Sequence, residues 1–167
     1  MNDTPIYLLD TSALVKRYHL EPGRSQIDAL FALSEKIILI SDLTVVEMHS
    51  FAGKKVRAKT LSWADFRSLL EQFSNDIRSG VLNVICLRSA HKRLAVELLD
   101  AHSPKRALRT LDALQLAMAT DLCRRGRLTC FVTADESLER IAELEGINVL
   151  NPEKEMVDGK NGPKTTV

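Results

Sequence analysis

Short apolar runs, each followed by polar residues and then by a helical pattern, recur along the whole chain. They lie at residues 6–9, 37–40, 81–87, 129–132 and 147–150. Continuous apolar runs of this length are typical of strands buried on both faces, as in parallel sheets. Strands that alternate with helices predict an α/β fold of three layers, α/β/α, with a central parallel sheet of five strands.

The segments between these runs repeat apolar residues at the three- and four-residue spacing of amphipathic helices. Ser, Thr, Asp and Asn at their starts and Gly at their ends predict where they begin and stop. Helices are predicted over residues 12–19, 24–34, 62–79, 89–101 and 110–125, with two more that begin at residues 43 and 133.

One domain accounts for the folded part, which we place at residues 1–150. Residues 151–167 are polar, contain two Gly and two Pro, and are predicted to form a disordered C-terminal tail. No internal repeat indicates a solenoid or a second domain.

Composition indicates an ordinary globular protein, with 45% hydrophobic and 27% charged residues. The start of the chain lacks the features of a signal peptide, and no run is long enough to cross a membrane, so we expect a cytoplasmic protein without membrane contact. The three cysteines have no paired spacing and are interpreted as reduced thiols, and the four histidines have no zinc-ligand spacing.

Four acidic residues hold positions that a parallel sheet brings to one edge. Asp10 and Asp135 follow apolar strands, Asp112 opens a helix after the cap Thr110, and Glu47 lies one turn into the helix after the second strand. Four carboxylates at one edge repel one another and raise one another's pKa values, and a divalent cation removes that conflict. An all-oxygen ligand set suits Mg²⁺ or Mn²⁺ rather than zinc or copper.

Glu47 shares a helical face with the apolar residues Leu43 and Phe51. An ionised glutamate within an apolar stripe is costly unless it is paired, protonated or bound to a cation. The alternative interpretation is that the stripe turns and Glu47 lies at its solvated edge.

Two capping patterns complete the local predictions. Thr133 with Glu136 fits a capping box, which leaves Asp135 without a structural role of its own. Ser62 with Asp65 opens the helix over residues 62–79, whose apolar stripe is interpreted as core or as a partner interface.

The acidic motifs, taken in order, resemble those of PIN-domain nucleases. The motifs are Leu-Asp-Thr-Ser-Ala-Leu at Asp10, Thr-Val-Val-Glu at Glu47, Leu-Asp-Ala-Leu-Gln-Leu-Ala at Asp112 and Thr-Ala-Asp at Asp135. Within that superfamily the chain looks most like the VapC-type toxins of bacterial toxin–antitoxin pairs. Each motif alone is weak, because Asp-x-Ser can simply cap a helix, but four in the right order are more specific.

This resemblance implies a strand order 3-2-1-4-5 and a Mg²⁺- or Mn²⁺-dependent endoribonuclease that acts as a toxin. It implies Asp10, Glu47, Asp112 and Asp135 as the catalytic and metal-binding cluster, with Ser12 and Thr133 as supporting hydroxyls. The implied partners are an RNA substrate, a cognate antitoxin and a second copy of the chain, the last two on the helix over residues 62–79.

The charge balance is compatible with a polyanionic substrate. The formal charge is +1, from 23 basic and 22 acidic residues; without the four clustered carboxylates, 18 acidic residues remain and the balance becomes +5. Lys16, Arg17, Arg106 and Arg109 lie near the acidic motifs and are candidate phosphate contacts, while solvated surface charge is the alternative for each.

Two other functions compete with the nuclease. Phosphoryl transfer through an aspartyl phosphate at Asp10 would favour a second Asp two residues on, but residue 12 is Ser, and the fourth strand is followed by Thr133 instead of Lys. A catalytically silent binding module of the same fold is the other alternative, although all four acidic positions are filled.

Overall fold

The computed structural model describes residues 4–154 as alternating strands and helices. The strands are β1 (Ile6–Leu9), β2 (Ile37–Ser41), β3 (Asn83–Ile85), β4 (Cys130–Val132) and β5 (Val149–Leu150). The helices are α1 (Thr11–Tyr18), α2 (Arg24–Ala32), α3 (Asp42–Arg57), α4 (Trp63–Arg78), α5 (Ser89–His102), α6 (Thr110–Arg124) and α7 (Glu136–Leu144).

The five strands form one sheet in the order β3-β2-β1-β4-β5, and every neighbouring pair is parallel. In the centre, Tyr7 of β1 is in register with Ile38 of β2 and with Cys130 of β4. The predicted parallel sheet and its strand order are confirmed. The carboxyl ends of β1 and β4 are therefore neighbours.

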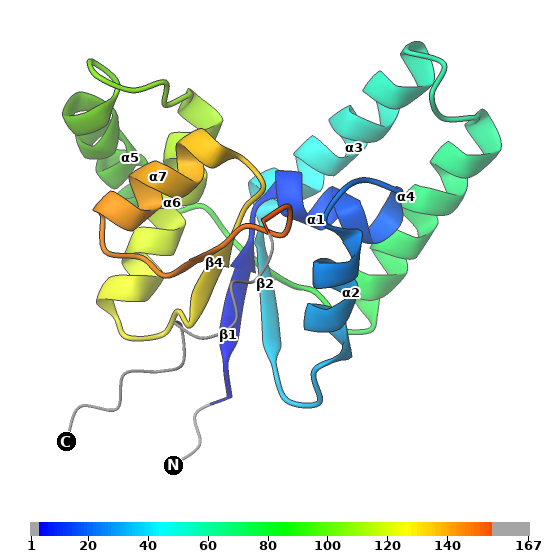
Figure 1. The fold of residues 1–167 in the computed structure, drawn as a ribbon, viewed down its shortest axis with the longest axis horizontal. Coiled ribbons are helices and arrows are strands. Elements are labelled where there is room, and N and C mark those ends of the chain that lie inside the picture. The colour runs from blue at the N-terminus through cyan, green and yellow to red at the C-terminus, as the bar shows by residue number, and fades with distance from the viewer. Residues whose placement is uncertain (1–3, 155–167) are drawn as a thin grey trace.

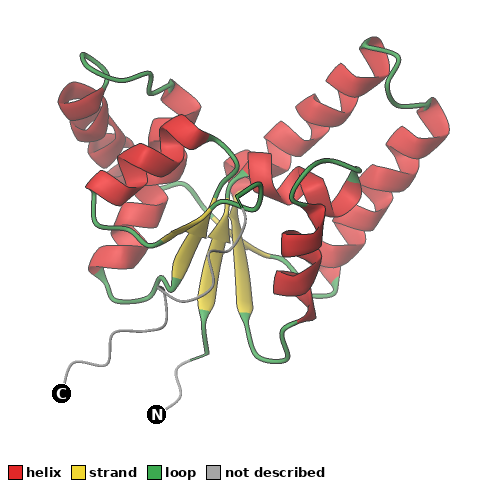
Figure 2. Ribbon diagram, viewed as in Figure 1, coloured by secondary structure: helices red, strands yellow, loops and turns green. Residues whose placement is uncertain are grey.

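Helices cover both faces of the sheet, as Figures 1 and 2 show. Leu8 and Phe131 point to one face, where they join a core with α5, α6 and α7. Leu9 and Val132, the next residue in each strand, point to the other face and pack with α1 to α4. All four are fully buried, because alternate residues of a central parallel strand face two different helix layers.

The third strand is shorter than the predicted run at residues 81–87. Gly80 adopts a left-handed conformation, and the backbone N–H of Leu82 bonds to the carbonyl of Asp76, so the start of the run belongs to the turn that ends α4. At the other end, the N–H of Leu87 donates to the carboxylate of Asp42 instead of to a neighbouring strand.

The described chain continues past β5 to Lys154. Asn151 and Pro152 are buried, so the first residues of the predicted tail pack against the domain. The rest of that predicted tail, residues 155–167, lies outside the described residues. Over residues 4–154, no helix combines the length and the apolar character needed to span a membrane.

Candidate active site

Two aspartates follow neighbouring central strands, Asp10 directly after β1 and Asp135 three residues after the end of β4. Asp10 follows β1 and is the N-cap of α1, while Asp135 follows β4 and is the N-cap of α7. Because β1 and β4 are parallel neighbours, both carboxylates lie at the carboxyl edge of the sheet.

The Asp10 carboxylate is 6% exposed and is surrounded by hydroxyl donors. Its Oδ2 atom accepts hydrogen bonds from the Ser12 hydroxyl at 2.7 Å and from the Thr133 hydroxyl at 3.3 Å. The Ser12 hydroxyl in turn accepts the N–H of Ala134 at 2.9 Å. The predicted supporting residues therefore join the end of β1 to the end of β4 through Asp10.

Burial raises the pKa of Asp10 from 3.8 to about 6, because desolvation disfavours the charged carboxylate. The Ser12 hydrogen bond opposes this shift, and the negative charge of Glu47 adds to it. Asp10 therefore titrates near pH 6, and a cation beside it would favour the ionised form.

Glu47 reaches the same site from α3. Its Oε2 atom accepts the Thr11 hydroxyl at 2.7 Å and the Gln115 amide at 3.2 Å. The buried stripe of α3 consists of Thr44, Met48 and Ala52, and Glu47 is half-buried beside it. Of the two interpretations of Glu47, the structure supports the one that places it at the edge of the apolar stripe.

Asp112 lies in the first turn of α6 and is half-buried. Its pKa is raised by burial and, next, by the charge of Asp135; Glu47 adds to the shift, and Arg109 opposes it. Asp135 and Glu47 are thus close enough to Asp112 for their charges to act on its carboxylate. The N-cap residue of α6 is Arg109, so the prediction that Thr110 caps this helix is wrong by one residue.

Asp135 has a structural role that the capping-box prediction missed. Its Oδ1 atom accepts the backbone N–H groups of Ser137 at 2.8 Å and Leu138 at 3.0 Å, so it caps α7 itself. The Thr133 hydroxyl instead accepts the N–H of Asp135 at 3.2 Å and bonds to Asp10. The capping box of Thr133 with Glu136 is therefore wrong, because Glu136 is already the first helical residue.

Three of the four carboxylates use one oxygen for bonds within the protein and keep the other free. Among residues 4–154, Asp10 Oδ1, Glu47 Oε1 and Asp135 Oδ2 accept no hydrogen bond from the protein. The same residues contain no group of three or more His, Cys, Asp or Glu side chains that could hold a metal ion as they stand. The edge is therefore a set of coupled carboxylates and not a preformed cage.

The four candidate phosphate contacts differ in their surroundings. Lys16 is buried and pairs with Glu153 and Glu21, and Arg17 bonds to Asp76 at 2.8 Å. Both cations are neutralised within the fold. Arg106 and Arg109 are exposed on the loop before α6.

Two residues that contact Glu47 at the candidate site were not predicted from the sequence. Thr11 and Gln115 both donate to Glu47, and Gln115 also donates to the Thr44 hydroxyl at 2.8 Å. Gln115 is 1% exposed and lies three residues after Asp112, on the same side of α6. A polar side chain between Leu114 and Leu116 was the signal in the sequence that could have identified it.

The fold recurs in solved structures with low sequence identity to the chain. FitAcB from Neisseria gonorrhoeae has a TM-score of 0.63 at 18% identity, with 87% of this chain and 97% of that chain covered. VapBC2 from Rickettsia felis, solved bound to a DNA fragment from its promoter, has a TM-score of 0.61 at 19% identity, with 87% and 98% covered. A toxin–antitoxin complex from Klebsiella pneumoniae has a TM-score of 0.57 at 22% identity, with 87% and 97% covered.

No curated protein matches the chain in sequence. The PIN domain family matches residues 7–144, which include all four acidic motifs and most of the chain. The resemblance drawn from those motifs is confirmed, and the chain belongs to the PIN domain family.

Proposed function

We propose that the protein is a Mg²⁺- or Mn²⁺-dependent endoribonuclease that acts in the cytoplasm as the toxin of a toxin–antitoxin pair. One observation supports this proposal: in a chain of the PIN domain family, the charge of Glu47 raises the pKa of Asp10, and the charges of Asp135 and Glu47 raise the pKa of Asp112. Electrostatic repulsion between such groups is relieved by a divalent cation with oxygen ligands.

Asp10, Asp112 and Asp135 would hold the cation directly or through water, and Glu47 would be a further ligand or would orient the attacking water. Free oxygens on Asp10, Glu47 and Asp135 fit this donor set. When bound, the cation supplies Lewis-acid stabilisation of the phosphate and lowers the pKa of a bound water.

The protein residues hold the carboxylates in place around that centre. Ser12 and Thr133 fix one oxygen of Asp10, so the carboxylate cannot rotate freely. Thr11 and Gln115 fix Glu47 in the same way, and the N-terminal N–H groups of α7 fix Asp135. Preorganised groups of this kind lower the cost of assembling the reactive geometry.

Cleavage of labelled structured RNAs tests the proposal. We expect the wild type to cut in Mg²⁺ or Mn²⁺ and not in EDTA, and Asp112→Asn to lower the rate by at least about a hundredfold. Asp121→Asn is the matched control, since Asp121 lies near the other end of α6 and pairs with Arg125 and His91. Loss of cutting in both variants, or cutting in EDTA, contradicts the proposal.

The toxin role and its partners rest on the similar structures, one of which is a toxin–antitoxin complex. We expect expression of the wild type to arrest bacterial growth and Asp112→Asn to leave growth unchanged. The exposed side of α4, where Trp63 is 69% exposed, is our candidate surface for an antitoxin or a second copy of the chain.

A silent PIN-fold binding module is the second candidate. It is favoured by the finding that residues 4–154 hold no preformed group of metal-binding side chains. Under this alternative the folded wild type binds RNA or a partner protein but cuts no RNA in either metal.

A further inference from the structure

Two cavities flank the turn that carries Asp135. Ala134 and Asp135 line one cavity of about 330 Å³. Glu136 and Ser137, the next two residues, line the other, of about 390 Å³. A strand of nucleic acid that crosses the carboxylate edge at Asp135 therefore has a hollow on either side of the turn.

The smaller cavity offers no free positive charge to an anion. Its cation is Lys16, which is 2% exposed. The Lys16 ammonium pairs with Glu153 and lies 3.8 Å from Glu21, and both carboxylates also line this cavity. A phosphate entering here would meet two carboxylates before it reached the ammonium.

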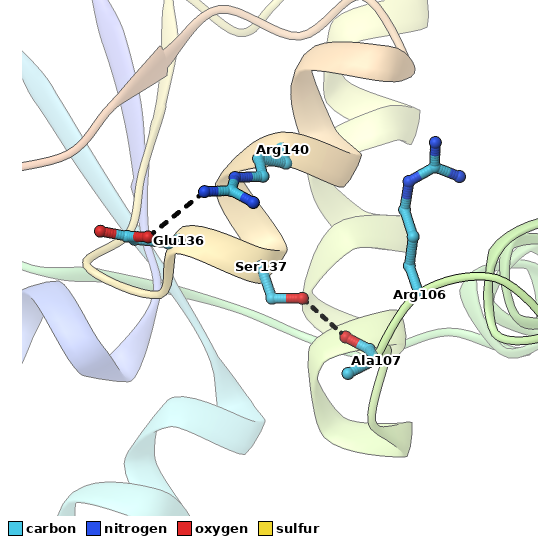
Figure 3. Close-up of a pocket in the computed structure, with 5 residues that line it drawn as sticks. All are labelled: Arg106, Ala107, Glu136, Ser137 and Arg140. Atoms are coloured by element: carbon cyan, nitrogen blue, oxygen red, sulfur yellow. Dashed lines mark hydrogen bonds and ion pairs between the residues drawn. The ribbon is translucent and has the colours of Figure 1, made fainter.

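The larger cavity, whose lining residues Figure 3 shows, offers positive charge to an anion. Arg140 comes from α7 and Arg106 from the facing loop before α6. The guanidinium of Arg106 forms no ion pair with residues 4–154, and Arg140 is paired only with Glu136, at 3.5 Å. Because the Arg140 and Glu136 side chains are 70% and 65% exposed, this pair is weak and can be exchanged for another anion.

The loop that carries Arg106 is fixed to the helix that carries Arg140. The Ser137 hydroxyl donates to the carbonyl of Ala107 at 2.8 Å, as Figure 3 shows. The N–H of Arg106 bonds to the carbonyl of His102 at 2.9 Å, and the Leu108 side chain is buried in the core. The positions from which the two arginines extend are therefore held on either side of the cavity.

We propose that this cavity binds an RNA backbone phosphate next to the one at the carboxylate edge, held by Arg106 and Arg140. One guanidinium group can donate two parallel hydrogen bonds to phosphate oxygens. Such a contact does not depend on the identity of the base. Glu136 is the competing anion, and it gives up Arg140 when the phosphate binds. This inference rests on the proposed function, and it adds that the strand extends to the Arg106 side of Asp135 and not to the Lys16 side.

Binding of a fluorescent single-stranded RNA to the Asp112→Asn protein, from 50 to 200 mM KCl, tests the inference. We expect Arg106→Ala and Arg140→Ala each to weaken binding roughly fivefold and to reduce the salt dependence by about one counterion. Arg124→Ala, at the far end of α6, is the matched control and should bind like the parent.

Removing the charge of Glu136, which competes with the phosphate for Arg140, should change RNA binding in the opposite direction. Glu136→Gln should tighten binding roughly twofold, since it frees Arg140, whereas Glu143→Gln makes the same charge change near the other end of α7 and should have a smaller effect. All of the substituted side chains in these two sets are exposed, so the fold is not at risk.

Arginine variants that bind like Arg124→Ala, while the wild type cuts RNA, overturn the phosphate site alone. Equal effects of Glu136→Gln and Glu143→Gln overturn it as well. Absence of metal-dependent cutting by the wild type overturns the proposed nuclease. The cleavage assay gives that result, so it is distinguished from failure of the phosphate site, which the binding assay measures.

Discussion

The Asp10 side chain combines burial with a position at the end of a central strand. It keeps a carboxylate out of water beside Glu47, and only hydroxyl and backbone groups donate to it within residues 4–154. A carboxylate in such surroundings is destabilised in its charged form. This cost in the ion-free protein can be measured.

Stability of the ion-free protein should fall as pH rises through the titration of Asp10. Its pKa is raised from 3.8 to about 6, so the folded protein keeps a proton that the unfolded chain has already lost. Folding stability is therefore highest below the unfolded pKa and decreases up to the folded pKa, by about 3 kcal/mol in total.

Urea unfolding in EDTA from about pH 4 to pH 7 checks this expectation, with Asp10→Asn as the comparison. Asparagine keeps the N-cap of α1 but cannot ionise, so the variant should lack this part of the decrease. Equal pH dependence in the two proteins would contradict the account of Asp10.

Lys16 and Glu153 form an ion pair whose members differ in burial, at 2% and 44% exposed. Glu153→Ala leaves a buried ammonium and should cost about 2 kcal/mol, less than for an isolated buried pair because Glu21 remains 3.8 Å away. Lys16→Met leaves a carboxylate that water can reach and should cost less than about 1 kcal/mol. Thermal unfolding of both variants measures the difference, and a larger loss in Lys16→Met would refute it.

The sequence predicted best the positions of residues whose place in the fold follows from the local pattern. Asp10, Asp112 and Asp135 were placed by strand ends and helix starts, which follow from local pattern. Gln115 was missed because it matters through its hydrogen bond to Glu47 on another helix. Periodicity along the sequence does not show a contact between two helices. The buried pairing of Lys16 was missed for the same reason, since Glu153 is far away in the sequence.

At the scale of elements, the start of α7 shows how one residue serves both structure and site. Asp135 accepts two N–H groups of α7 through one oxygen and keeps the other oxygen free of protein donors within residues 4–154. The two roles can be separated by substitution.

Asp135→Asn should retain the cap and the stability of the wild type but lose RNA cleavage, because asparagine accepts the same hydrogen bonds without the charge. Asp135→Ala should lose cleavage and also about 1 kcal/mol of stability. Cleavage and urea unfolding, measured on the same preparations, check both statements. Wild-type cleavage by Asp135→Asn would remove Asp135 from the metal-binding set.

The turn between α1 and α2 packs closely against the chain after β5. Gly23 has a φ of 83°, and a Cβ atom there would lie 2.5 Å from the carbonyl oxygen of Pro152. Gly23→Ala should therefore destabilise the protein in two ways. The left-handed backbone is strained for alanine, and the added Cβ atom clashes with Pro152.

Gly146 is a matched control, with a φ of 76° and no atom within 4 Å of an added Cβ. Gly146→Ala should cost about 1 kcal/mol, and Gly23→Ala about 2 kcal/mol more. Thermal unfolding measures both, and equal losses would show that the contact with Pro152 yields easily.

The types and order of the elements were predictable because continuous apolar runs mark the strands and three- and four-residue apolar spacing marks the helices. The element boundaries were harder to predict, since Asp10 and Asp135 cap helices that the sequence pattern would start elsewhere. The shortening of β3 depends on Asp42, which takes the N–H of Leu87 from another part of the chain.

At the scale of the whole molecule, two hydrophobic cores hold one sheet between them, and the acidic residues meet where the sheet ends. One core belongs to α5, α6 and α7, and the other to α1 through α4. Asp112 and Asp135 come from the first layer and Glu47 from the second, so the site depends on both layers packing on the same sheet (Figure 1).

Calorimetric titration of Mn²⁺ into the metal-free protein tests the claim that these carboxylates form one divalent-cation centre. We predict saturable binding that is weakened at least about tenfold by Asp10→Asn and by Asp112→Asn. Binding should release protons near pH 6, since Asp10 must ionise. Asp121→Asn, the control on α6, should bind like the wild type. An absence of saturable binding, or equal affinity in all four proteins, would contradict the account.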